Sequence, residues 1–98
     1  MAWIFEVKDK SGRKIHLSKE RWSHISQEHP EAADYFEEIK ETIANPDKIT
    51  AYSQDEDIKY YFKYFKGRQS AAKFLLVIVK YLNGHAFIVT AYFVRTIK

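Results

Sequence analysis

The chain has no cysteine, only two prolines and only three glycines among its 98 residues. Without cysteine it can form neither disulfides nor Cys-based metal sites, and it needs no oxidising compartment. Hydrophobic residues make up 46% of the sequence and aromatic residues 16%, a composition that supports a packed core and disfavours disorder. We therefore expect one folded domain over residues 1–98, because this length supports a single core.

Long hydrophobic runs are also missing. The longest uninterrupted apolar stretch is residues 74–79, far shorter than the roughly 20 residues of a helix that crosses a bilayer. The N-terminus lacks the basic start and the apolar run of a signal peptide, so we expect a cytoplasmic protein with no membrane partner. The net charge of +3 favours polyanionic partners only slightly.

Periodicity and turn signals predict an α+β domain with a short N-terminal hairpin, two helices and an antiparallel sheet of about four strands. Ser18 offers the hydroxyl of a helix N-cap, Pro30 separates the two helices, and Asn45-Pro46 ends the second. The expected strands are residues 2–8, 13–17, 48–53, 58–65, 72–81 and 86–97, and the expected helices are residues 19–29 and 31–44.

The dipeptide Asn83-Gly84 is the strongest hairpin signal, because a type I′ turn needs positive φ at both central positions. If Leu82 pairs with His85, alternation sorts the last two strands into two faces. We assign to the core the apolar set Phe74, Leu76, Ile78, Val89, Ala91 and Phe93. The second face then carries Lys73, Leu75, Val77, Thr90 and Tyr92, joined by Lys59, Tyr61 and Lys63 if the preceding strand also turns its apolar set inward.

Two histidines of the predicted first helix are candidates for acid–base chemistry. His24 lies one turn from both Arg21 and Glu28, and a carboxylate can orient an imidazole that exchanges protons near neutral pH. His29 ends the helix, where the dipole favours the imidazolium. The alternative is structural, with His24 as an exposed surface residue and His29 as a cap or a gap filler.

A metal site and a nucleophilic serine have less support. His24 and His29 are five residues apart, whereas a spacing of four would put two imidazoles on one helix face. The sequence has no glycine-rich phosphate loop and no nucleophile elbow. We expect no metal ligands and no cofactor.

Thr90 and Tyr92 interrupt a final strand that is otherwise apolar. Beside Lys73 they would form a set of two hydroxyls and one cation that can bind a phosphate, and the alternative is simple β-propensity. Tyr60, Tyr61 and Tyr64 lie among basic residues, which are Lys59, Lys63, Lys66 and Arg68. Such tyrosines more often pack than stack on bases, but they leave a surface for single-stranded nucleic acid open.

Several segments together resemble a known group of proteins. They are Arg21-Trp22-x-His24-Ile25, His29-Pro30-Glu31, Asn45-Pro46-Asp47-x-Ile49, Tyr60-Tyr61 and Val89-Thr90-Ala91-Tyr92. In this order, over residues 21–98, they resemble the phage-associated BECR nuclease families (barnase, EndoU, colicin and RelE-like). The resemblance implies N-terminal helices followed by an antiparallel sheet. It also implies metal-independent RNA cleavage, in toxins or in phage-related proteins, by attack of the ribose 2′-hydroxyl on the adjacent phosphate to leave a 2′,3′-cyclic end.

The resemblance also implies roles for individual residues. His24 is the first choice for the acid–base catalyst and His29 the second, with Thr90 and Tyr92 at the phosphate or the base. Further substrate contacts are expected from Arg21, Lys73, Lys80, Arg95 and Tyr61. Helices on the apolar sheet face would put His24 on the side opposite Thr90. Either a helix end reaches round the sheet edge, or the face assignment is inverted.

Two other interpretations stay open. One is a non-catalytic module of the same fold that binds nucleic acid or a protein through its basic aromatic face. The other is a structural interaction domain, such as a homodimer formed along an exposed strand edge. For the enzyme, RNA is the expected partner, and a protein inhibitor or antitoxin is a second one.

Overall fold

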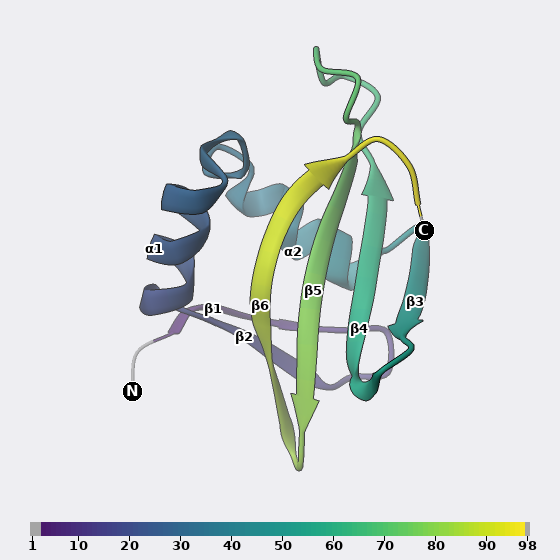
Figure 1. Ribbon diagram of the computed structural model, residues 1–98. Helices are drawn as coiled ribbons and strands as arrows, with labels where there is room; N and C mark the ends of the chain where they lie inside the picture. Colours follow the sequence, from purple (N-terminus) through teal and green to yellow (C-terminus); the bar gives the residue numbers. More distant parts are fainter. Residues whose placement is uncertain (1–2, 98) are drawn as a thin grey trace.

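The computed structural model describes residues 3–97, which form two α-helices, a short 3₁₀ turn and one six-stranded sheet (Figure 1). In chain order the elements are β1 (Trp3–Lys8), β2 (Lys14–Ser18), α1 (Lys19–Glu28), the 3₁₀ turn η1 (Pro30–Ala32), α2 (Phe36–Ala44), β3 (Lys48–Tyr52), β4 (Asp55–Tyr64), β5 (Phe74–Leu82) and β6 (His85–Val94). The predicted α+β class is confirmed.

The sheet has more strands than the sequence predicts, because the N-terminal hairpin joins it. The strand order is β1-β2-β6-β5-β4-β3. β2 pairs with β6 in parallel through Ile15–Ala86 and His16–Phe87, whereas the other neighbouring strands are antiparallel. The expected sheet of about four antiparallel strands is therefore wrong in strand number and in one pairing. β2 joins β6 because each of these strands has a free backbone edge, and pairing satisfies the N–H and C=O groups there.

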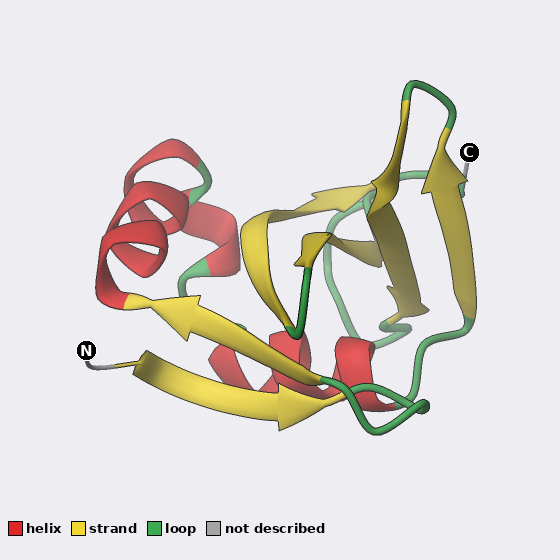
Figure 2. Cartoon of the chain, turned by 90° about the horizontal axis from the view of Figure 1, so that it is seen from below, coloured by secondary structure: helices red, strands yellow, loops and turns green. Residues whose placement is uncertain are grey.

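The sheet curls around its core. The hairpin of β1 and β2 crosses behind the lower ends of β4 to β6, and α2 covers the same rear side above it (Figures 1 and 2). α1 stands beside β6 at the left-hand edge in Figure 1. Within residues 3–97, no helix crosses the front of the sheet as seen in that view.

The two helices follow the sequence signals unequally well. Ser18 caps α1 as predicted, because its hydroxyl accepts a hydrogen bond of 3.1 Å from the backbone N–H of Arg21. The second helix was expected from residue 31, but α2 begins only at Phe36. Pro30 starts the 3₁₀ turn instead, and the break lets the Tyr35 ring pack edge-on against Phe93 at 4.8 Å. Packing of that aromatic pair outweighs helix propensity here.

A β-bulge decides which side chains face the core. The Asn83-Gly84 turn forms and Leu82 pairs with His85 as predicted. Only Gly84 has a positive φ, of +79°, so the predicted type I′ turn, which needs positive φ at Asn83 as well, is wrong. The pairing continues to Val79–Ile88 and then shifts, so that Ile78 lies opposite Thr90 and Val89 is left over. An extra residue in one strand changes the face of every later residue relative to its partner strand.

The predicted core face is therefore wrong for β5 and β4 and correct for the end of β6. Leu75, Val77 and Val79 are fully buried with Ala91, in the same cluster as Ile39 and other residues of the helices. The opposite face of β4, β5 and β6 points away from α2. We call this surface the outer face and define it by Tyr60, Phe62, Leu76, Ile78, Thr90 and Tyr92, which are paired with one another across the three strands.

A chain of hydrogen bonds ties the β1–β2 turn to the core. Tyr81 donates to Asp9 Oδ2 at 2.9 Å, and the hydroxyls of Tyr61 and Tyr81 are hydrogen-bonded to each other. Burial and the bond to Tyr61 raise the pKa of the Tyr81 phenol far above its usual range. Burial alone would raise the pKa of Asp9, but hydrogen bonds from Ser11, Arg13 and Tyr81 outweigh it and hold that pKa below its usual value.

Replacement of Asp9 by alanine should therefore destabilise the fold by about 1–2 kcal/mol at neutral pH, because the Tyr81 hydroxyl loses its charged acceptor. A lowered pKa in the folded state gives stability that is complete above the unfolded value of about 4 and disappears as the pH falls through the folded value. Urea unfolding from neutral pH down to about pH 2 measures the difference between the two proteins. The difference should shrink in acid, whereas Asp34→Ala, at an exposed turn position, should change stability little at any pH. A difference that stays constant with pH would contradict this account.

Candidate active site

His29, at the C-terminal end of α1, meets Tyr92 of β6. The two rings are stacked, with centroids 4.7 Å apart and an interplanar angle of 22°. Burial of Ile25 fixes α1 beside β6, and Pro30 follows His29 directly and begins the next turn. The end of the first helix thus reaches round the sheet edge and brings an imidazole to the outer face.

A carboxylate lies beside this imidazole. Glu31 Oε2 is 3.9 Å from His29 Nδ1, and the His29 side chain remains 31% exposed. A negative charge on the Nδ1 side favours the tautomer that carries its proton there, which leaves the lone pair on Nε2. The imidazole is therefore partly exposed and has a carboxylate near one of its nitrogens.

Thr90 lies two residues before Tyr92 on the same face of β6, about 7 Å away along the strand. Its Oγ1 atom is buried and has no hydrogen-bond partner among the side chains and backbone of residues 3–97. A buried hydroxyl without a partner costs about 1–3 kcal/mol and is uncommon in folded proteins. The hydrogen-bonding capacity of this hydroxyl is therefore unused among the described residues.

Phenols gather on the outer face. The Tyr60 ring is stacked against Tyr52 with centroids 6.0 Å apart. Burial raises the pKa of the Tyr60 phenol, and its neighbours Tyr52 and Tyr92 raise it further, because their ionised forms would repel its negative form. The Tyr60 hydroxyl therefore stays protonated near neutral pH and is a hydrogen-bond donor.

A cavity of about 440 Å³ adjoins Tyr92. After β6, the chain turns across the upper ends of β5 and β4 (Figure 1), and this segment contributes Arg95 and Thr96 to the cavity rim. Strands contribute the remaining walls with Tyr60, Phe62, Leu76, Tyr92 and Val94. Of the predicted site residues, Tyr92 and Arg95 meet here, and His29 stacks on the first of them.

Other predicted site residues lie elsewhere. The His24 side chain is exposed on α1 and makes no hydrogen bond or ion pair with residues 3–97. Five residues separate His24 from His29, which places them about 140° apart around an ideal helix. Arg21 is exposed one turn from the start of the same helix. Tyr61, only 3% exposed, is part of the core.

Two of the predicted lysines are held by the protein itself. Lys73 donates to the backbone carbonyl of Arg68. Lys80 Nζ is 2.6 Å from Asp55 Oδ2, and this hydrogen bond raises the pKa of Lys80 and lowers that of Asp55. Their charges are therefore partly satisfied, and Arg95 is the predicted cation that lines the cavity beside Tyr92.

The remaining two histidines have other positions. His16 is 8% exposed, lies 2.7 Å from Glu6 Oε2 through Nε2, and has Nδ1 3.2 Å from the carbonyl oxygen of Ala86. Trp3 stacks on its ring at 4.2 Å. These contacts tie β1, β2 and β6 together, so His16 is a structural histidine that alternation alone did not reveal.

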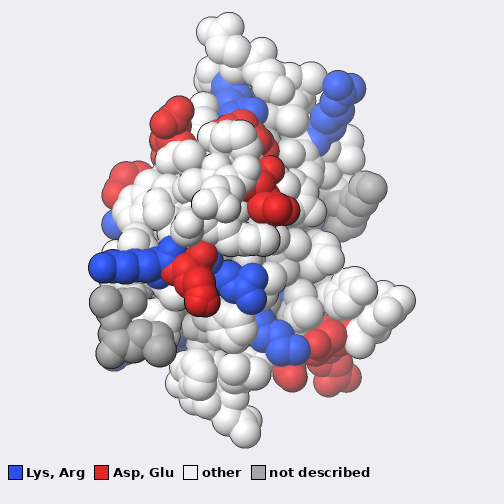
Figure 3. All heavy atoms as spheres, turned by 60° about the vertical axis from the view of Figure 1, so that its left-hand side comes forward, with Lys and Arg blue, Asp and Glu red and all other residues white. Residues whose placement is uncertain are grey.

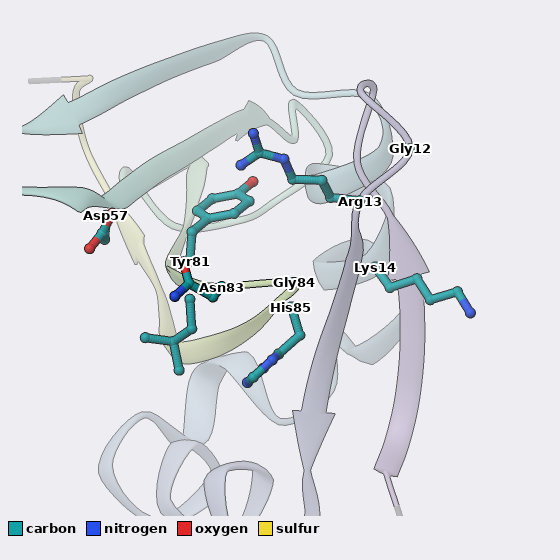
Figure 4. Close-up of a pocket in the computed structure, with 9 residues that line it drawn as sticks. Gly12, Arg13, Lys14, Asp57, Tyr81, Asn83, Gly84 and His85 are labelled. Carbon is teal, nitrogen blue, oxygen red and sulfur yellow. The ribbon is translucent and has the colours of Figure 1, made fainter.

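A larger cavity, of about 780 Å³, contains His85 but lies apart from Tyr92 (Figure 4). The Tyr81 phenol points toward Arg13, Lys14 is directed away, and Asp57 lies on the opposite side. The Tyr81 hydroxyl already donates a hydrogen bond to Asp9, and charges of both signs line the walls. This cavity therefore lacks the free hydroxyls and the imidazole–phenol contact of the outer face.

Charge is mixed over the surface that includes α1. Figure 3, which brings the α1 side forward, shows Lys and Arg groups interspersed with Asp and Glu groups rather than gathered in one basic patch. The formal net charge is only +3. The side shown in Figure 3 therefore presents mixed charge rather than a broad positive field. No helix among the described residues has the length and apolar character needed to traverse a membrane.

The helices leave one face of the sheet open, and the His29 imidazole meets the Tyr92 phenol at that face. The chain belongs to the family described as phage-Barnase-EndoU-ColicinE5/D-RelE like nuclease 2, whose profile matches residues 5–96. The resemblance inferred from the sequence is therefore confirmed. Searches of curated proteins and of solved structures found no match.

Proposed function

We propose that the domain is an endoribonuclease that cleaves RNA by attack of the ribose 2′-hydroxyl on the adjacent phosphate. Membership of a nuclease family supports the reaction class. The stacked pair His29–Tyr92 is the observation on which the assignment of residues depends, because it joins an imidazole from α1 to a phenol from β6. His29 rather than His24 is then the acid–base residue.

The side chains suit the separate demands of this reaction. Nε2 of His29 accepts the proton of the 2′-hydroxyl, and Glu31 at 3.9 Å from Nδ1 stabilises the imidazolium that results. The oxygen then attacks phosphorus, and the bond from phosphorus to the 5′-oxygen breaks. The Tyr92 phenol donates a proton to that leaving oxygen, so the products are a 2′,3′-cyclic phosphate and a free 5′-hydroxyl.

Charge on the phosphorane needs donors that are already in place. Arg95 at the cavity rim offsets the negative charge, whereas the buried Thr90 hydroxyl would have to be uncovered before it could donate to a non-bridging oxygen. Donors that are in place before the reaction stabilise a transition state more than the ground state.

Incubation of the purified protein with end-labelled RNA in EDTA tests the proposal. Cleavage that leaves 2′,3′-cyclic ends, with an all-deoxy oligonucleotide of the same sequence left intact, is the expected result, because the nucleophile is the 2′-hydroxyl. Binding of RNA without cleavage would instead identify a non-catalytic module. Cleavage of both oligonucleotides would mean that water rather than the 2′-hydroxyl attacks.

A further inference from the structure

We propose that the cavity beside Tyr92 is a nucleobase-binding site, which holds the base of the nucleotide next to the cleaved phosphate. The inference rests on the proposed function for the position of that phosphate, but the binding of a base can be measured without any cleavage. The volume of the cavity, about 440 Å³, lies within the range of roughly 300–1,000 Å³ that is typical of ligand pockets.

The floor of the cavity is apolar. Phe62 is 1% exposed and Leu76 is 4% exposed, although both belong to the outer face, and Val94 completes this part of the lining. An apolar floor cannot satisfy the hydrogen-bonding groups of a bare phosphate or a sugar. It suits the flat, weakly polar face of an aromatic heterocycle.

Two tyrosine rings form the walls. Tyr60 and Tyr92 line the cavity from strands on either side of β5, and stacking of a base on such a ring contributes about 1–3 kcal/mol. Each ring is fixed by an aromatic partner that does not line the cavity: Tyr52 stacks on Tyr60 and His29 on Tyr92. Walls held in this way lose little side-chain entropy when a base enters.

The rim supplies the polar contacts. Arg95 and Thr96 follow β6 and reach the cavity from the C-terminal segment. A guanidinium has five N–H donors and a threonine hydroxyl can donate or accept, so together they can bind the carbonyl and ring-nitrogen acceptors at the edge of a base. An apolar floor, aromatic walls and a polar rim are the combination expected at a site for single-stranded nucleic acid.

Tyr92 links this site to the proposed catalytic group. One phenol both lines the cavity and stacks on the His29 imidazole. A base bound in the cavity is therefore separated from His29 only by the Tyr92 ring. The sugar and phosphate of the same nucleotide can span that distance. Base binding would position the 2′-hydroxyl for the reaction.

Titration of the whole protein with guanosine 3′-monophosphate, followed by NMR or calorimetry, tests the inference. Saturable binding is expected, with signals of Tyr60 and Tyr92 shifted, whereas ribose 5-phosphate, which has no base, should bind at least about tenfold more weakly. Val94→Trp fills the cavity and should weaken nucleotide binding by about tenfold or more. Ile49→Trp, at an exposed position of β3 outside the cavity, is the matched control and should bind as the unmodified protein does.

Arg95→Ala provides a second variant, because the exposed Arg95 can be removed without disturbing the core, and it should also weaken binding. His29→Ala should lose cleavage of RNA but should still bind the nucleotide in a saturable way, because His29 does not line the cavity. Equal binding of ribose 5-phosphate, or normal binding by both Val94→Trp and Arg95→Ala, would overturn the nucleobase site. Nucleotide binding in a protein that never cleaves RNA would overturn the proposed function alone.

Discussion

Replacement of His29 by alanine should lower the rate of RNA cleavage by about 10²- to 10⁴-fold, the contribution expected of a general acid–base residue. The imidazole is stacked on Tyr92 and partly exposed beside Glu31, so its loss removes the proton acceptor for the 2′-hydroxyl and little packing. Cleavage rates measured with saturating labelled RNA report this effect directly. Circular dichroism and thermal unfolding should show that the variant remains folded.

His24→Ala is the matched control for this variant. It removes the same side chain from the same helix, five residues earlier, at an exposed position. Its cleavage rate should stay within about threefold of the unmodified rate, since surface substitutions rarely have larger effects. The opposite pattern, with His24→Ala inactive and His29→Ala active, would restore the assignment that the sequence alone favours.

Insertion of one alanine between Ile78 and Val79 should destabilise the fold by about 3 kcal/mol or more. Val89 is the unpaired residue of the bulge between Val79–Ile88 and Ile78–Thr90. The inserted residue gives Val89 a partner, so the bulge is lost, and regular alternation across the insertion turns the residues from Thr90 to Phe93 and their partners in β5 to the opposite face. Phe93 then leaves the core, a loss comparable to truncation of a buried phenylalanine. Thr90 and Tyr92 turn inward, so RNA cleavage should be lost as well.

Val89→Ala keeps the number of residues and is the control. Val89 is only partly buried, so this change should cost about 1 kcal/mol and leave cleavage nearly unchanged. Urea unfolding of the two variants gives the comparison. An insertion variant as stable and as active as Val89→Ala would show that the bulge does not set the outer face.

Local signals in the sequence predicted the elements well where a short segment decides its own structure. Ser18 caps α1 through its own side chain, and Asn83-Gly84 forms the β5–β6 turn because Gly84 can adopt φ +79°. Alternation also placed Thr90 and Tyr92 away from the core, and Ala91 and Phe93 within it. All of these depend on residues that are close in sequence.

Features that depend on distant contacts were not predictable in the same way. The bulge at Val89 has no glycine or proline to announce it, and it reversed the faces of β5 and β4 relative to expectation. Parallel pairing of β2 with β6 joins segments about 70 residues apart and leaves no pattern in either strand. Tyr60, Thr96 and the floor of the cavity were missed for the same reason.

The candidate site was predicted in part. Sequence patterns singled out both histidines of the first helix and both hydroxyls of the last strand, but they ranked His24 above His29 because Arg21 and Glu28 lie one turn from it. The helix spacing says nothing about which side of α1 meets the sheet. Contact with Tyr92, which depends on how α1 lies against β6, favours the other histidine.

The central claim is that His29 and Tyr92 bind one phosphate together. NMR signals of the histidine and tyrosine rings, followed during titration with a dinucleotide that lacks the attacking 2′-hydroxyl, test it without turnover. The account predicts that the His29 and Tyr92 signals shift together in one saturable transition while those of His24 stay in place. A shift of the His24 signals with His29 and Tyr92 unchanged would contradict it.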